Sequence, residues 1–137
     1  MSEQDCLFCK IVRGEIPAST VYEDQDTLAF MDINPASRGH LLVIPKRHYR
    51  DLHELPEAEL AKCAAVGKRL AARQRELLGA DGVNLLNSCG EDAWQTVFHF
   101  HLHVIPRYFG DPLRLPWDPK PGDLAEIGEA AKLLTEN

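Results

Sequence analysis

The chain has 137 residues, of which 45% are hydrophobic and 26% charged, a composition typical of one globular domain with its own core. The net charge of −6 argues against a basic nucleic-acid-binding surface. We find no apolar run long enough to span a bilayer and no basic-then-apolar leader. We therefore expect a single domain over residues 1–137 in the cytoplasm, with neither a nucleic-acid nor a membrane partner.

The first third of the chain predicts one short helix followed by three strands. The helix is expected to end before Gly14 and Pro17, and the turn Asp24-Gln25-Asp26 makes the first two strands a hairpin. The expected bounds are Leu7–Val12 for the helix and Thr20–Glu23, Thr27–Asp32 and His40–Ile44 for the strands, with Pro45 ending the last.

A long helix is predicted over Pro56–Leu78, with Pro56 in its first turn and Gly79 ending it. Its apolar residues recur at steps of three and four, which predicts one buried stripe. The stripe consists of Leu60, Cys63, Gly67, Leu70 and Leu77. The basic residues on the other face are expected to be solvated.

Two more strands, Val83–Ser88 and His99–Ile105, are predicted after this helix. A Pro-rich stretch then leads to a final helix from Leu124, where Asp123 and Glu126 have capping-box spacing. This order of elements predicts an α+β domain, an antiparallel sheet with helices on one face.

The most informative stretch is the run 99–105, in which His99, His101 and His103 alternate with apolar residues. In a strand this places the three imidazoles on one face and Phe100, Leu102 and Val104 on the other. Alternate residues lie roughly 6–7 Å apart, so the three cannot all bind one metal ion. A merely solvated strand would be served as well by Ser or Thr, so we interpret the three histidines as having separate tasks along a groove.

The four cysteines do not indicate a disulfide framework in a cytosolic chain of this size. Cys63 falls on the apolar stripe and Cys89 follows a strand, and both are interpreted as packing residues. Cys6 and Cys9 form a CxxC pair whose spacing leaves three interpretations open: zinc ligands, a redox pair, or two buried thiols.

The histidine run resembles the signature of the histidine-triad (HIT) hydrolase family, His-φ-His-φ-His-φ-φ with φ apolar, and matches it at every position. Further matching blocks occur in the family's order, at residues 14–17, 30–33, 43–48 and 95–96. The resemblance extends from about Cys6 to Arg107 and leaves residues 108–137 as a C-terminal extension. It implies a sheet of about five strands with one long helix and a short N-terminal helix, to which the sequence pattern adds the C-terminal helix.

The resemblance also implies a mechanism, in which His101 attacks the α-phosphorus of a nucleotide and forms a covalent nucleotidyl-histidine. His103 would lie beside the phosphate or leaving group as a hydrogen-bond donor or acid. An imidazole with an ordinary pKa is substantially neutral at cytoplasmic pH, which leaves one ring nitrogen free as a nucleophile.

Positions that match the family's nucleotide contacts are spread over the chain. They imply an apolar base pocket, an acid for the ribose hydroxyls, and polar phosphate contacts: Phe8, Ile11, Phe30 and Ile33; Asp32; and Ser88, Gln95 and Thr96. Two positions depart from the family pattern. Trp94 stands where glycine is common, and Ser88 stands where an amide is common, with Asn87 beside it.

One branch of the family has a structural zinc site, and the matching residues here are Cys6, Cys9, His48 and His99. Two thiolates with two imidazoles suit tetrahedral zinc. The resemblance also implies a homodimer formed through the long helix and a neighbouring strand.

The expected function is therefore a purine-nucleotide phosphoramidase or nucleotidyl hydrolase. A dinucleoside polyphosphate hydrolase of the same family is the nearest alternative. From other classes, two of the strand histidines with a third ligand would make a zinc-water hydrolase, and a non-enzymatic nucleotide-binding protein is the third possibility.

Overall fold

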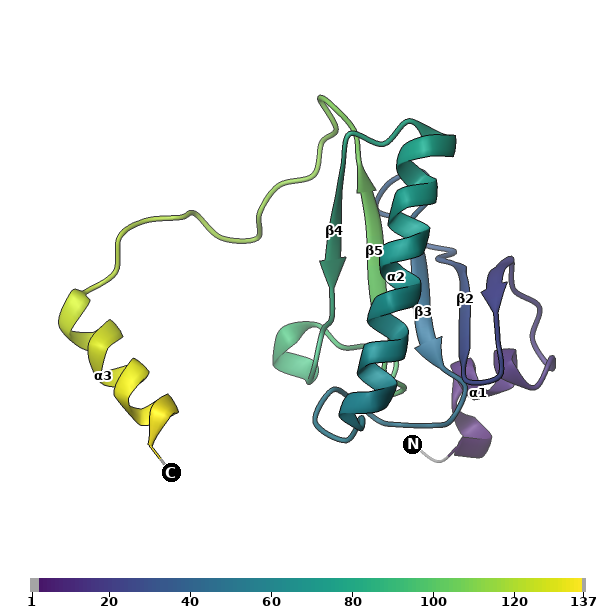
Figure 1. Cartoon of the computed structure of the whole chain (residues 1–137), viewed down its shortest axis with the longest axis horizontal. Helices are drawn as coiled ribbons and strands as arrows, with labels where there is room; N and C mark the ends of the chain where they lie inside the picture. Colours follow the sequence, from purple (N-terminus) through teal and green to yellow (C-terminus); the bar gives the residue numbers. More distant parts are fainter. Residues whose placement is uncertain (1–2, 137) are drawn as a thin grey trace.

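The computed structural model describes residues 3–136 and confirms the expected α+β class. One antiparallel sheet of five strands has the order β1-β2-β3-β5-β4, with the long helix α2 lying across it (Figure 1). The strands are β1 (Thr20–Glu23), β2 (Thr27–Met31), β3 (Leu41–Pro45), β4 (Gly82–Leu86) and β5 (Leu102–Arg107). The helices are α1 (Leu7–Val12), α2 (Glu57–Leu78) and α3 (Leu124–Thr135), with short 3-10 turns η1 (Glu3–Asp5) and η2 (Glu91–Ala93).

The predicted strands are all present, but several bounds were wrong. The largest error concerns the histidine run, because β5 begins at Leu102 and the backbone of His99 and His101 lies before the strand. The alternation of faces nevertheless holds, since Phe100, Leu102 and Val104 all belong to the core beneath α2. The sequence predicted that Pro45 would end the third strand after Ile44. β3 instead includes Pro45, which pairs with Thr27 at the start of β2.

The sheet is covered on both faces, whereas the sequence predicted helices on one. On one face, Cys63, Val66 and Leu70 of α2 pack on residues of β2, β3 and β5. On the other face, Phe8 and Cys9 of α1 pack on alternate residues of β2 and β3. The sequence predicted α1 as a short helix without a buried face, because six residues show too little periodicity to reveal one.

α2 follows the predicted bounds except that Pro56 is its N-cap, and Gly79 ends the helix with a left-handed φ of 71°. Gly67 allows a close approach to the sheet, because an added Cβ would lie 3.2 Å from a methyl of Leu102. The predicted stripe fails at its end, where Leu77 is 65% exposed. Gln74 is buried instead, and its amide donates to the carbonyls of Gly39 and Val104.

The C-terminal extension leaves the end of β5, passes the β4 edge and carries α3 away from the rest of the molecule (Figure 1). Asp123 caps α3 as predicted, accepting from the amide of Glu126 at 3.2 Å. Within residues 3–136, none of the helices is both long and apolar enough to cross a membrane.

Candidate active site and metal centre

A cavity of about 330 Å³ opens on the α1 face of the sheet, a volume within the range of small-molecule sites. It brings together most of the positions predicted to contact a nucleotide: Phe8, Ile11, Phe30, Asp32, Ile33, Thr96, His101 and His103. Apolar side chains and the two histidines line it together, and the ring of Phe8 packs against that of His101. The cavity therefore joins an apolar subsite to a potential nucleophile.

His101 is held in one tautomer by a main-chain carbonyl. Its Nδ1 lies 2.8 Å from the carbonyl oxygen of His99, which only accepts, so Nδ1 carries the proton. Burial lowers the pKa of His101, so the ring is neutral near pH 7 and Nε2 has a free lone pair. Phe8 packs edge-on against the ring at 5.1 Å, and Asn87 donates to the His101 carbonyl at 3.0 Å. Backbone and ring are thus fixed together.

His103 is oriented by His40, a residue that the sequence analysis did not select. The amide of Ala36 donates to Nδ1 of His40 at 2.9 Å, so the proton of the neutral His40 ring is on Nε2. That Nε2–H donates to Nδ1 of His103 at 2.9 Å, while Asp32 Oδ2 lies 3.5 Å from the same nitrogen. Nδ1 of His103 is therefore an acceptor, and its Nε2 carries a hydrogen.

The charge states agree with this chain of hydrogen bonds. Burial lowers the pKa of His40, and burial together with the neighbouring His101 and His40 lowers that of His103 to about 4. Both rings are neutral at pH 7. The only sequence signal for His40 was a histidine at the start of an apolar strand, which is weak evidence by itself.

Two predicted phosphate contacts lie outside the cavity lining. Ser88 is buried, at 8% exposure, and does not line the cavity. Gln95 is also buried, and its side chain braces the preceding loop by accepting from the Gly90 amide and donating to the carbonyls of Arg50 and Val97. In this structure the Gln95 side chain shapes the loop that carries Thr96.

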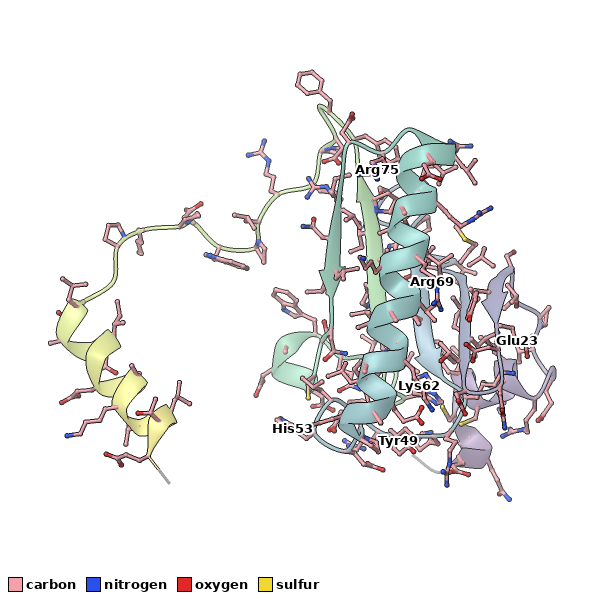
Figure 2. The ribbon with its side chains drawn as sticks, viewed as in Figure 1. Glu23, Tyr49, His53, Lys62, Arg69 and Arg75 are labelled. Atoms are coloured by element: carbon pink, nitrogen blue, oxygen red, sulfur yellow. The ribbon has the colours of Figure 1, made fainter. Side chains whose placement is uncertain are left out.

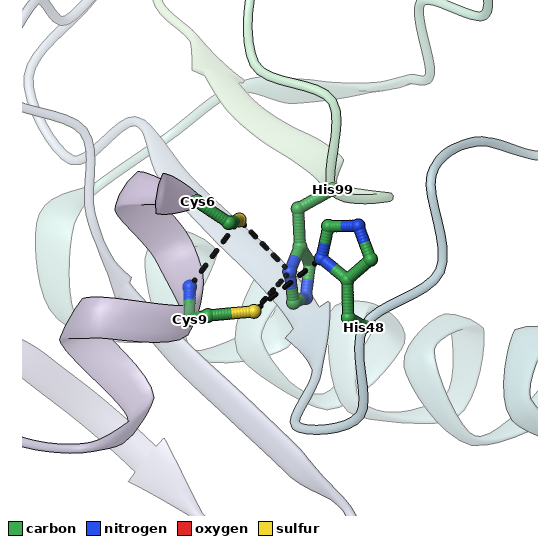
Figure 3. A group of neighbouring side chains, drawn as sticks. All are labelled: Cys6, Cys9, His48 and His99. Carbon is green, nitrogen blue, oxygen red and sulfur yellow. Dashed lines mark hydrogen bonds between the residues drawn. The ribbon is translucent and has the colours of Figure 1, made fainter. Parts of the chain in front are cut away.

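The four predicted zinc ligands, from three separate parts of the chain, converge behind the histidine run (Figure 3). His99 donates from Nε2 to the Pro45 carbonyl at 2.8 Å, which turns the lone pair of Nδ1 toward both thiols. That Nδ1 lies 3.5 Å from each of Cys6 Sγ and Cys9 Sγ, and Nδ1 of His48 lies 3.3 Å from Cys9 Sγ.

These separations fit one tetrahedral ion. Bond lengths of about 2.3 Å to sulfur and about 2.05 Å to nitrogen imply roughly 3.5 Å between adjacent S and N ligands. Burial and the adjacent Cys6 raise the pKa of Cys9 to about 12, so a buried thiolate here requires a compensating cation. The donor set and its spacing are suited to zinc.

Comparison with known proteins accounts for this arrangement. Residues 13–110 match the HIT domain. The chain belongs to the HIT family. An uncharacterized HIT-like protein of Methanocaldococcus jannaschii is 50% identical over 90% of this chain and 88% of its own length.

Two related HIT proteins have named activities. Adenosine 5'-monophosphoramidase HNT1 of Saccharomyces cerevisiae is 37% identical over 94% of this chain and 80% of its own length. Adenylylsulfatase HINT3 of Arabidopsis thaliana is 43% identical over 77% of this chain, although that match spans only 53% of its own length.

Solved HIT structures agree with the fold over nearly the whole chain. A Streptococcus mutans protein superposes with a TM-score of 0.91 at 43% identity, covering 97% of this chain and 85% of its own. A zinc-bound histidine-triad family protein of Mycobacterium smegmatis superposes with a TM-score of 0.79 at 46% identity, covering 98% of this chain and 99% of its own.

Trp94 lines the cavity in an unusual backbone conformation. Its φ of 74° lies in the left-handed region, where a non-glycine residue is disfavoured by about 1–2 kcal/mol. Hydrogen bonds across the loop, from Trp94 N to Glu91 O and from Gln95 N to Gly90 O, both 3.0 Å, hold this conformation. The indole is 63% exposed and lines the cavity, so a broad aromatic surface lies at its rim.

Proposed function

We propose that this chain is a purine-nucleotide phosphoramidase or nucleotidyl hydrolase that acts at the α-phosphate through a nucleotidyl-His101 intermediate. One observation carries the proposal, the fixed tautomer of His101 beside a cavity of suitable size. The two relatives named as an adenosine 5'-monophosphoramidase and an adenylylsulfatase support an adenosine nucleotide as substrate.

In the first step, the lone pair on Nε2 of His101 attacks the α-phosphorus. The bond from phosphorus to the leaving group breaks, and the leaving group departs with its electron pair. Nε2–H of His103 donates a hydrogen bond to the departing atom. In the second step, water attacks the same phosphorus and releases a proton to solvent, and the His101 nitrogen leaves with its electron pair, so two displacements replace one.

The apolar part of the cavity is the proposed base site. Phe8 and Phe30 pack edge-on at 5.4 Å, which gives the site a rigid wall. Asp32 lines the same cavity, and we assign it to the ribose hydroxyls because a carboxylate accepts from two adjacent hydroxyl groups. Thr96 is assigned to the phosphate.

A dinucleoside polyphosphate hydrolase is the second candidate, and Trp94 favours it. A second nucleoside on the leaving group would offer a planar base to the exposed indole, and stacking of this kind stabilises binding by about 1–3 kcal/mol. A zinc-water hydrolase is less favoured. The described residues do bring Asp32, His40 and His103 within metal-binding reach of one another, but only one of these is a histidine of the triad run.

We propose a structural zinc ion held by Cys6, Cys9, His48 and His99. The ion would tie the N-terminal segment to the loop before β5, and all four protein ligands are present, so it has no open position for catalysis. The zinc-bound M. smegmatis relative supports this assignment. Four free cysteines and a thiolate-bound ion suit a reducing compartment, and we propose the cytoplasm.

We also propose a homodimer formed through β4 and α2. β4 is an edge strand, and Val83, Leu85 and Leu86 on it are each at least 40% exposed. An unprotected edge with apolar side chains is a template for pairing with another strand. A groove between α2 and β4, lined by Ala71 and Ala72, continues this surface. Light scattering that gives a monomer mass at micromolar concentration would contradict the homodimer.

The enzymatic proposal is tested with a substrate panel and one variant. Turnover of adenosine and guanosine phosphoramidates is compared with that of diadenosine tri- and tetraphosphates. His101→Asn should remove nearly all turnover while nucleotide binding persists, because the base and ribose contacts lie elsewhere. Rapid quenching should trap a nucleotidyl adduct on the unmodified chain and none on the variant. Near-normal turnover by His101→Asn would refute the mechanism.

A further inference from the structure

The C-terminal arm, residues 111–136, ends in a helix whose apolar side is covered by no other helix or strand among residues 3–136. Leu124, Ile127 and Leu134 lie at three- and seven-residue steps on one side of α3 and are 83%, 52% and 87% exposed. An isolated helix of 12 residues is marginal in water, so a stable α3 requires a surface to pack against.

We propose that the arm is exchanged between two copies of this chain, with α3 of one copy docked in a groove on the other. This inference rests on the proposed homodimer. The groove lies between the C-terminal half of α2 and strands β1–β3, and its lining includes Val21, Met31, Leu41, Leu70, Arg73 and Leu77. Leu77, which the sequence predicted to be buried, is 65% exposed there, and Val21 is 45% exposed.

Charge complements the apolar match. α3 contains Glu126 and Glu129 and is capped by Asp123, with Lys132 as the one cation of the helix. Arg73 lines the groove, and Arg69 lies nearby on α2, stacked over Tyr22 of β1 (Figure 2). Acidic groups on the helix and basic groups at the groove steer the two surfaces together.

The start of the arm directs it away from its own groove. The guanidinium of Arg107 donates to both carboxylate oxygens of Asp111 at 2.7 and 2.9 Å, and Asp111 also accepts from the amides of Tyr108 and Leu113. Prolines at 112, 116, 119 and 121 then favour an extended tether. The tether leaves past β4, whereas the groove lies on the β1–β2 side of α2 (Figure 1).

The match to one solved relative extends into the arm. The S. mutans structure superposes on 97% of this chain, which leaves out about four residues of 137, far fewer than the arm contains. The match therefore includes most of the arm. An arm that stands off its own body is suited to binding a second copy across the β4 edge (Figure 1).

Cross-linking between differently marked copies tests the exchange. On a Cys89→Ser background, one full-length chain carries Arg73→Cys and a second, with a size tag, carries Glu126→Cys. After subunit mixing, a short bis-maleimide should link a tagged to an untagged chain. A doubly substituted chain that links only within itself would overturn the exchange, as would the absence of any link between groove and arm.

A matched pair of substitutions provides the second test. Ile127→Asp places a charge on the apolar stripe, whereas Leu133→Asp places the same charge on the opposite side of α3. Losing one buried side chain from each of two arms should raise the dimer dissociation constant about a hundredfold, or about tenfold per arm. Leu133→Asp should change it less than threefold.

Two outcomes distinguish a failure of the arm exchange from a failure of the homodimer proposal. A dimer whose dissociation constant is unchanged by Ile127→Asp would overturn the arm exchange and leave the homodimer standing. A monomeric unmodified chain at micromolar concentration would overturn both. Turnover on the substrate panel is measured independently, so neither result bears on the enzymatic proposal.

Discussion

Replacing His40 with alanine should slow turnover while nucleotide binding persists, because His40 contacts His103 and does not line the cavity. The variant removes a neutral N–H···N hydrogen bond, which contributes about 1 kcal/mol net and corresponds to roughly five- to tenfold in population. If His103 then adopts the other tautomer, its donor is lost, and the full contribution of general acid catalysis is about 10²–10⁴-fold. We therefore expect His40→Ala to lower kcat at least about fivefold, and less than His103→Ala does.

Two further substitutions separate the two hydrogen bonds of His40. His40→Gln retains an N–H close to the position of Nε2, whereas His40→Asn retains an acceptor close to Nδ1, facing the Ala36 amide. If orientation of His103 is the role of His40, Gln should restore most of kcat and Asn should not. His53→Ala is the control, because His53 is an exposed histidine in the loop before α2 (Figure 2).

Steady-state kinetics and thermal unfolding together decide the outcome. His40→Ala leaves the Ala36 amide unpaired, which costs about 1–3 kcal/mol of stability, so kcat must be measured where each variant is fully folded. A kcat within twofold of the unmodified protein would refute the role assigned to His40. So would a larger loss than that caused by His103→Ala, since a positioning residue cannot contribute more than the residue it positions.

Three other measurements test separate parts of the site. Protein purified in reducing buffer without chelator should hold about one zinc per chain. Cys9→Ser should lose both the metal and thermal stability, whereas the control Cys89→Ser should keep both. A metal-free protein as stable as the protein with metal would contradict the zinc site. Burial holds the pKa of His103 near 4, below its value of about 6.5 in the unfolded chain, so the folded state binds fewer protons between these two pH values. The contribution of neutral His103 to the free energy of unfolding is therefore present above pH 6.5 and is lost as the pH falls toward 4. Urea titrations from pH 7 to 4 should show this loss reduced in His103→Gln, and equal slopes in both proteins would count against a neutral buried ring. Trp94→Gly and Trp94→Ala both remove the indole, but only glycine relieves the left-handed φ of 74°, so the glycine variant should be about 1 kcal/mol more stable by chemical denaturation; an alanine variant of equal stability would show that the backbone is not strained.

The sequence predicted most of the fold because its signals are local. The hairpin at Asp24 follows from one carboxylate, which accepts from the amides of Asp26 and Thr27 at 2.8 Å. Gly79 ends α2 because the backbone turns left-handed there. The alternation of residues 99–105 placed Phe100 and Val104 in the core although regular pairing begins only at Leu102, since side-chain direction persists beyond the last ladder hydrogen bond.

The site was harder to predict from the sequence, because much of it depends on contacts between segments that are distant in the chain. His40 meets His103 across the β3–β5 pairing, 63 residues away, and no local pattern marks it. Gln95 was predicted to contact phosphate, and in this structure its side chain accepts from the Gly90 amide and donates to the carbonyls of Arg50 and Val97. A polar side chain in a tight loop serves the ligand or the backbone, and composition alone does not separate these roles.

Leu77 shows what hydrophobic periodicity measures. A three- and four-residue spacing reports that a face of α2 avoids water, and it contains no information about which chain covers that face. Within one copy, the packing of α2 on the sheet ends at Gln74, whose amide pairs with two carbonyls, and the apolar stripe continues one turn further to Leu77. The apolar side of α3, at the far end of the arm, is likewise exposed within one copy. The groove beside Leu77 is apolar with basic residues at its edge, and the apolar side of α3 lies on an acidic helix. Both surfaces are explained together if α3 of one copy covers the groove of a second copy.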